Sequence, residues 1–147
     1  MRAERVLQFV DSNVLIYAYD VTGGVKHEQA KALLASLWES RYGCLSIQVL
    51  QEFYVTVTRK VARPLAGEVA AEIVADLAAW RVHAPIVEDV KQAIATHRRY
   101  EISFWDAMVI RSAAQLGCRM LWSEDLNSGQ VYEGVRVMNP FAEPERG

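Results

Sequence analysis

Four acidic residues occupy positions from which side chains of distant chain segments could meet. Asp11 directly follows the short apolar run Val6–Val10, Asp125 follows a later apolar run, and Glu52 and Asp106 fall in helix-like stretches. Carboxylate oxygens are the ligands that Mg²⁺ and Mn²⁺ prefer. Carboxylates packed together repel one another, and a divalent ion relieves that repulsion while it lowers the pKa of a bound water and neutralises a phosphate. The pattern therefore predicts metal-dependent chemistry on a phosphoester.

Each acid also has a purely structural interpretation. Asp11 and Asp125 could serve as turn residues or helix N-caps, roles that aspartate fills well. Asp106 shares a helix face with the apolar residues Val109, Ile110 and Ala113, where a carboxylate is costly unless it is paired or binds a cation. It could instead complete a capping box with Ser103, and the two roles can coexist.

Glu52 has the least distinctive surroundings of the four acids. Helical spacing sets it with Gln48 and Thr56, away from the apolar stripe that includes Leu50, Tyr54 and Val57. Such a glutamate is usually solvated, but one that faces an open groove would show the same spacing.

Other catalytic systems lack support in the sequence. It contains no Gly-x-Ser-x-Gly elbow, no phosphate-binding glycine loop and no histidine pair at metal-ligand spacing. His27, His83 and His97 are scattered, and each is expected to lie at the surface or to be satisfied in the core. Cys44 and Cys118 stand in apolar runs far apart, which favours buried free thiols over a zinc site and fits a reducing cytoplasm.

The elements that must position the acids alternate between strands and helices. Apolar runs predict strands and 3.6-residue periodicity predicts helices. The expected strands are Val6–Val10, Gly43–Ser46, Val82–Ala84, Arg119–Trp122 and Val135–Met138, and the expected helices are 13–19, 26–41, 48–62, 67–80, 87–99 and 104–116. This alternation predicts an α/β fold with a mostly parallel sheet, in which ligands bind at the carboxyl ends of strands where the strand order reverses.

Length and charge limit the classes of protein that fit. The chain has 147 residues and a net charge of −2, with a pI near 5.9. This length fits one domain, and the charge disfavours a large uniformly basic surface for nucleic acid. Small basic clusters, Arg59–Arg63 and Arg98–Arg99, leave local RNA binding open. No signal peptide is recognisable, and no apolar stretch approaches the about 20 residues that span a bilayer.

Four motifs closely resemble the PIN domain in its VapC-type toxin branch. They are FVDSNVLIYAYD, SIQVLQEFYVT, SFWDAMVIRSA and LWSEDLNSGQ, the last followed by VRVMNPF. The resemblance runs from about Val6 to Phe141, and a single PIN-like domain over residues 1–147 is expected. The D-x-N start is weak alone, whereas four motifs in this order and spacing are specific. The resemblance implies a three-layer α/β/α sandwich with four or five mostly parallel strands.

The resemblance also assigns roles to individual residues. It implies a pocket for one or two Mg²⁺ or Mn²⁺ ions, with Asp11 and Asp106 as principal ligands. Glu52 and Asp125 would also belong to the metal-binding acids, Glu52 to orient a water or act as base and Asp125 to complete the site or hold a second ion. Further residues implied near the pocket are Asn13 and Ser123, which would hydrogen-bond the acids, Glu124 as a rival to Asp125, and Asn127 at the rim.

The function implied is hydrolysis of RNA, with a 5′-phosphate and a 3′-hydroxyl as products, by the toxin of a type II toxin–antitoxin pair. A cognate antitoxin and a homodimer are the implied partners, with Tyr54, Val57 or Trp80 as contacts unless the core buries them. An alternative is a catalytically inert PIN-like module that binds RNA or protein. A phosphoesterase of the aspartyl-phosphate type fits less well, because it needs an acid where Asn13 stands.

Overall fold

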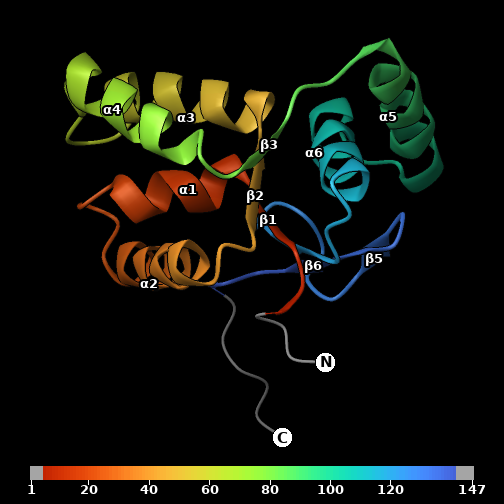
Figure 1. The fold of residues 1–147 in the computed structure, drawn as a ribbon, viewed down its shortest axis with the longest axis horizontal. Helices are drawn as coiled ribbons and strands as arrows, with labels where there is room; N and C mark the ends of the chain where they lie inside the picture. The colour runs from red at the N-terminus through yellow and green to blue at the C-terminus, as the bar shows by residue number, and fades with distance from the viewer. Residues whose placement is uncertain (1–4, 142–147) are drawn as a thin grey trace, which may run out of the picture.

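The computed structural model describes residues 5–141 and shows helices on both faces of one sheet (Figure 1). Within this range the strands pair in the order β3-β2-β1-β4-β6-β5. They are β1 (Gln8–Val10), β2 (Gly43–Ser46), β3 (Arg81–His83), β4 (Met120–Trp122), β5 (Val131–Tyr132) and β6 (Val135–Met138). All neighbouring strands run parallel except β5 and β6. The mostly parallel sheet confirms the predicted fold class.

The helices form the two outer layers. They are α1 (Ser12–Tyr19), α2 (Val25–Ser40), α3 (Ile47–Arg59), α4 (Gly67–Leu77), α5 (Val87–Tyr100) and α6 (Phe104–Gln115). In Figure 1, α1 to α4 lie on one side of the sheet and α5 and α6 on the other, which makes three α/β/α layers. Because the chain moves outward from β1 to β2 and β3 and then returns to β4, the strand order reverses between β1 and β4.

Within residues 5–141 the sheet has six strands, one more than the upper number implied by the resemblance. The additional strand, β5, holds only Val131 and Tyr132 and pairs antiparallel with β6. The connecting turn has φ 50° at Glu133 and 83° at Gly134, as a type I′ hairpin turn requires. Two residues are too few to produce an alternating pattern, so this strand leaves no signal in the sequence.

The helix expected to end at Trp80 ends earlier, at Leu77. The residues that follow turn toward β3, so Trp80 leaves the helix and packs against β2. A Cβ added to Gly43 would lie 2.4 Å from the Trp80 ring, which shows how closely the indole covers this strand. Gly43 is therefore required where the indole crosses the backbone.

The sheet is buried between its helical layers, as parallel sheets usually are. Phe9, Val10, Leu45 and Leu121 are all fully buried in it. Cys44 and Cys118 are free and buried, as predicted. No helix in the described part of the chain combines the length and the apolar composition that crossing a membrane requires.

A buried polar network joins β3, α5 and α6. Asp89 accepts hydrogen bonds from Arg111 Nε (2.8 Å) and from the Ile86 amide (2.9 Å), and it lies 3.2 Å from His83 Nε2. The other ring nitrogen of His83 is 2.8 Å from Ser112 Oγ. The order Ser–His–Asp resembles a hydrolase triad, but the Ser112 hydroxyl is fully buried and cannot meet a substrate. The network is structural, and His83 is a satisfied core histidine.

Candidate metal centre

Three of the four predicted acids meet at the carboxyl edge of the sheet. Asp11 directly follows β1 and Asp125 lies three residues after β4, and these two strands flank the point where the strand order reverses. Asp106 comes from the first turn of α6. One carboxylate oxygen from each of the three lies within 4.8 Å of the others. The fold therefore brings together acids that are separated by up to 114 residues in the chain.

Asp11 is the most buried acid of this group, with 4% of its surface exposed. It caps α1, because its Oδ1 accepts a hydrogen bond of 2.7 Å from the Ser12 amide. Its Oδ2 accepts one of 2.8 Å from Ser123 Oγ. Burial raises the pKa of Asp11 to about 7, and the charges of Asp125 and Glu52 add to this rise, while the hydrogen bonds from Ser123 and Ser12 oppose it. The capping role and the cluster role thus coexist.

Asn13 and Ser123 connect the acids. The Asn13 amide group donates to Asp11 Oδ2 at 3.3 Å and to Asp125 Oδ2 at 3.0 Å. Its carbonyl oxygen accepts from the Glu124 amide at 3.3 Å. Ser123 is fully buried and also accepts the Asp125 amide at 3.2 Å. These bonds fix the orientation of two carboxylates before any ion binds.

Asp106 combines the two roles that its position allowed. Ser103 caps α6, because its hydroxyl accepts the Asp106 amide at 3.0 Å, while the Asp106 carboxylate belongs to the acidic group. Burial raises the pKa of Asp106, and the nearby Asp125 charge raises it further, against the effect of Ser103. Val109, Ile110 and Ala113 on the same helix are buried, as expected.

Glu52 lies outside the three-acid group but close enough to share its field. Glu52 is an exposed residue of α3. Partial burial of the carboxyl raises its pKa, as do the charges of Asp106 and Asp125, and the Gln48 side chain opposes the rise. Glu52 therefore stands at the rim of the acidic group, with its carboxylate within electrostatic reach of two members.

The two lesser candidates point elsewhere. Glu124 Oε2 forms an ion pair of 2.8 Å with Lys26 Nζ of α2, so its carboxylate is already neutralised. Asn127 is exposed and donates to Gln130 Oε1 at 3.0 Å. Of the adjacent acids 124 and 125, the second is the one that joins Asp11 and Asp106.

Two residues beside the acids escaped prediction from the sequence. Lys26 holds Glu124 and lies 5.1 Å from the centre of the Tyr17 ring. Gln48 donates to the Trp105 carbonyl at 3.3 Å, while its own Oε1 is buried without a hydrogen-bond donor among residues 5–141. Neither stands in a distinctive local pattern, because both are polar residues near helix starts. Contacts formed only in the folded chain reveal them.

The residues fit a hard divalent cation. The donors are carboxylate oxygens, which Mg²⁺ and Mn²⁺ favour, and histidine and cysteine contribute nothing to the group. The raised pKa values of Asp11 and Asp106 mean that ionisation of these carboxyls costs free energy in the folded chain. A cation that lies between these carboxylates would remove that cost.

Comparison with known proteins identifies the fold family. The family model of the PIN domain matches residues 9–133. The chain belongs to the PIN-domain family. Its strands and helices form the α/β/α layers expected for a PIN domain.

Solved structures share this PIN fold. One is VapC20 from Mycobacterium tuberculosis, described as a sarcin-ricin loop cleaving toxin; it is 24% identical, with a TM-score of 0.59, over 80% of this chain and 89% of that one. Another is a toxin–antitoxin complex from Klebsiella pneumoniae; it is 16% identical, with a TM-score of 0.65, over 91% of this chain and 98% of that one. Comparison with curated protein sequences gives no match.

The raised pKa of Asp11 predicts an unusual dependence of stability on pH in the metal-free PIN domain. The folded chain binds this proton more tightly than the unfolded chain, because the pKa rises from 3.8 to about 7 on folding. Stability is therefore lost as pH rises from about 4 to about 7, by up to about 4 kcal/mol. Asp11→Asn removes this loss, and asparagine can still cap α1. We expect the variant to melt several degrees above the wild type at pH 8 in EDTA, and near it at pH 4.

Thermal unfolding followed by circular dichroism measures this difference. Glu72→Gln, which removes an exposed charge from α4, is the matched control and should leave the melting temperature unchanged at both pH values. Saturating Mn²⁺ should stabilise the wild type and remove the advantage of Asp11→Asn at pH 8. An advantage that is equal at pH 4 and pH 8 would contradict the origin assigned to it.

Proposed function

We propose that this PIN domain is a metal-dependent ribonuclease, the toxin of a type II toxin–antitoxin pair. The observation that carries the proposal is the meeting of Asp11, Asp106 and Asp125 within 4.8 Å at the carboxyl edge of a PIN sheet. A group of carboxylates that holds a divalent ion can activate a bound water, and this chemistry suits hydrolysis of a phosphodiester.

The aspartates would hold one or two Mg²⁺ or Mn²⁺ ions. When bound, such an ion stabilises charge on the phosphate and makes water more acidic. Asp11 contributes a fixed carboxylate, because Ser123 and Ser12 hydrogen-bond its two oxygens. Asp125 is exposed and held through Asn13, so it completes the pocket from the solvent side.

Glu52 is the proposed base or water-positioning residue. Its carboxylate lies at the rim, outside the three-acid group, so it stays available to accept a proton from the attacking water. The raised pKa of Glu52 brings it nearer to neutral pH, where a general base works best. In-line attack on the phosphorus would leave a 5′-phosphate and a 3′-hydroxyl.

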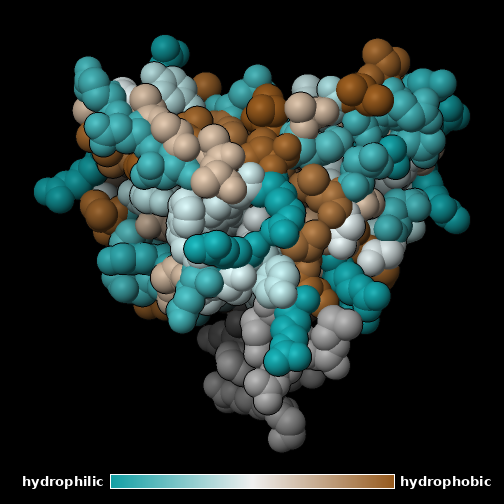
Figure 2. All heavy atoms as spheres, viewed as in Figure 1, coloured by the Kyte–Doolittle hydropathy of each residue, from teal (hydrophilic) through white to brown (hydrophobic). Residues whose placement is uncertain are grey.

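The toxin role rests on the described activities of structural relatives. VapC20 is described as cleaving the sarcin-ricin loop, and the second structure as a toxin–antitoxin complex. Hydrophobic side chains also gather between the α3/α4 and α5/α6 pairs on one face (Figure 2), and exposed apolar residues on these helices include Val55, Val87 and Trp105. An antitoxin segment that covers this face would bury them and close the approach to the acids.

A homodimer and a cytoplasmic location complete the proposal, for one PIN-like domain over residues 1–147. Among the residues considered as dimer contacts, Val57 is fully buried and is excluded, whereas Tyr54 is 43% exposed and stays available. The buried free thiols fit a reducing compartment.

Metal removal tests the proposed function directly. We expect cleavage of a mixed single-stranded RNA to stop in excess EDTA and to return on addition of Mg²⁺ or Mn²⁺, with 5′-phosphates on the new ends. Gel electrophoresis and end-labelling provide the readout, and Ca²⁺, with its looser coordination, provides a control ion. Cleavage that persists in EDTA would reject the metal mechanism. RNA binding without cleavage, together with no Mg²⁺ or Mn²⁺ binding by calorimetry, would indicate the inert module instead.

A further inference from the structure

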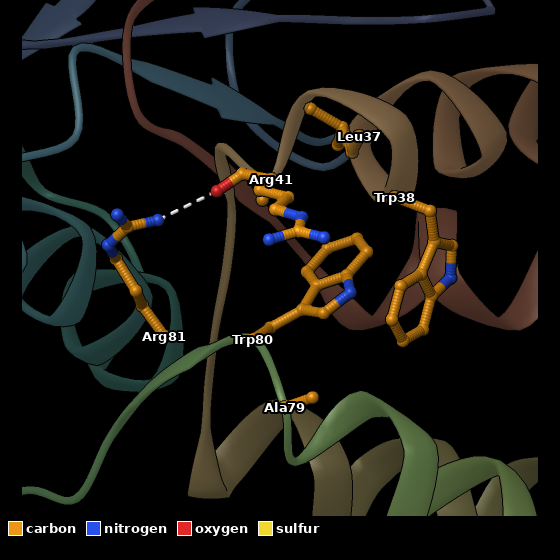
Figure 3. Close-up of a pocket in the computed structure, with 7 residues that line it drawn as sticks. Leu37, Trp38, Arg41, Ala79, Trp80 and Arg81 are labelled. Atoms are coloured by element: carbon orange, nitrogen blue, oxygen red, sulfur yellow. Dashed lines mark hydrogen bonds between the residues drawn. The ribbon is translucent and has the colours of Figure 1, made fainter.

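A second candidate site lies at the opposite edge of the sheet from the acids. A cavity of about 660 Å³ opens where β2 and β3 begin, next to the end of α2 (Figure 3). Its lining combines aromatic and basic residues: Leu37, Trp38, Arg41, Gly43, Ala79, Trp80 and Arg81. Because β2 and β3 start here and parallel strands share their direction, this cavity marks the amino edge, and the acids mark the carboxyl edge.

Two tryptophans form an aromatic wall in this cavity. The rings of Trp38 and Trp80 meet edge to face, with 5.3 Å between their centres and 74° between their planes. Trp38 is 38% exposed although it is a large apolar residue. The Trp80 indole is held in place because Gly43 leaves room for it against β2. An exposed, fixed indole is a surface on which a nucleobase can stack.

Two arginines complete the cavity. Arg81 Nη1 donates to the Arg41 carbonyl at 2.8 Å, and in Figure 3 the Arg41 side chain extends toward the Trp80 indole. Both residues are exposed, and neither forms an ion pair with a carboxylate within residues 5–141. Arg41 also adopts a positive φ of 66°, at a helix end where glycine is usual. Unpaired guanidinium groups are well suited to phosphate oxygens.

The same edge carries more arginines beyond the cavity. Arg119 immediately precedes β4, and Arg5 lies three residues before β1. Both are exposed, and in the described segment neither is paired with a carboxylate. Since the strands are parallel, these residues and the two in the cavity follow one another along a single edge. This edge provides a row of positive charge that suits the repeated phosphates of a polynucleotide.

We propose that the amino edge of the sheet is a second RNA-contacting surface, in which the Trp38–Trp80 cavity accepts one unstacked nucleotide and Arg41 and Arg81 hold its phosphate. The proposal rests on RNA as the substrate of the proposed function. A nucleotide satisfies both the indoles and the guanidinium groups, whereas an acidic peptide would use the arginines alone. The row of arginines beyond the cavity favours a strand of RNA over a free nucleotide.

Fluorescence anisotropy of a labelled ten-nucleotide single-stranded RNA tests this surface in EDTA, where metal-dependent cleavage is stopped. We expect Arg41→Gln/Arg81→Gln to make the slope of log affinity against log salt shallower by about 1.4, because each lost phosphate contact contributes about 0.7. At 0.1 M salt this change corresponds to an affinity for RNA that is about 25-fold weaker. Trp38→Leu should weaken binding about tenfold through lost stacking. The matched control is Lys31→Gln/Lys91→Gln, which removes two exposed charges outside this edge and outside the small basic clusters and should bind as the wild type does.

The outcomes separate this inference from the proposed function. Equal RNA affinity of the test and control pairs would overturn the second surface, whatever the result of the cleavage assay. The proposal would also be overturned if the cavity variants bound adenosine monophosphate more weakly than the wild type but bound RNA equally well, since the cavity would then serve a free nucleotide. Mg²⁺-dependent cleavage of RNA is assayed separately on the wild type, so its absence would reject the ribonuclease without altering the binding result.

Discussion

Asp11→Asn and Asp106→Asn should each lower RNA cleavage by about a thousandfold. Both side chains belong to the acidic group, and each replacement removes one negative charge while the shape of the side chain is kept. A bound divalent ion stabilises the transition state by several kcal/mol, and each 1.4 kcal/mol corresponds to a factor of ten in rate. Initial rates on a defined RNA with Mg²⁺ or Mn²⁺ measure the loss.

The controls for this experiment separate chemistry from folding. Glu72→Gln removes an exposed charge on α4 and should cleave at the wild-type rate. Ser123→Ala removes the hydroxyl that orients Asp11 from 2.8 Å and should cost about 10- to 100-fold, less than loss of the acid itself. Undiminished cleavage by both aspartate variants, each folded by circular dichroism, would reject the assignment of the site.

Asp89→Ala should destabilise the fold by about 3–5 kcal/mol. Asp89 is only 3% exposed and accepts hydrogen bonds from Arg111 and from the Ile86 amide, and it lies against His83. Its removal leaves a buried imidazole and a half-buried guanidinium without their anion, which is the costly way to break a buried ion pair. Urea unfolding at pH 7 gives the free energy of unfolding for the comparison.

The adjacent Glu88 offers the matched control. It is exposed on the same turn of α5, and its ion pair with Lys91 at 3.5 Å is solvated, so Glu88→Ala should leave the free energy of unfolding almost unchanged. Acid sensitivity gives a second readout. Burial alone would raise the pKa of Asp89, but the Ile86 amide, Arg111 and His83 outweigh it and the pKa lies below its ordinary value. The stability that Asp89 provides is present above pH 4 and is lost as pH falls through the folded pKa, and Asp89→Ala should lack this loss. Equal effects of the two alanine variants would contradict the role of the network.

The sequence was sufficient to select Asp11 and Asp106 as candidate acids and to place a further acid at residue 124 or 125. Asp11 directly follows one apolar run and Asp125 lies three residues after another, so a parallel sheet brings them to the same edge. Asp106 stood out because a carboxylate among Val109 and Ile110 needs a partner. Each of these patterns depends on one strand end or one helix face, so it can be recognised in the sequence without knowledge of the folded structure. The roles given to these acids stay predictions for the variants above to test.

Other features depend on contacts between distant segments, which a single sequence does not display. Periodicity could not separate a solvated Glu52 from one at the rim of a pocket, since both positions face away from the core. The choice between Glu124 and Asp125 depends on Lys26, which lies 98 residues away and pairs with the first of them. The cavity at the amino edge depends on the early end of α4 and on the fit of Trp80 to Gly43. None of these leaves a pattern in its own segment.

The opposite placement of acids and arginines on one sheet has a consequence for encounters with a polyanion. With a net charge of only −2, the molecule experiences little overall attraction or repulsion. Charge separated across the fold nevertheless gives the molecule an electric dipole, and an external field exerts a torque on a dipole. In the field of a phosphodiester backbone, such a particle rotates until its arginine edge leads. Productive approach with the acidic edge first would then require divalent ions to be in place already.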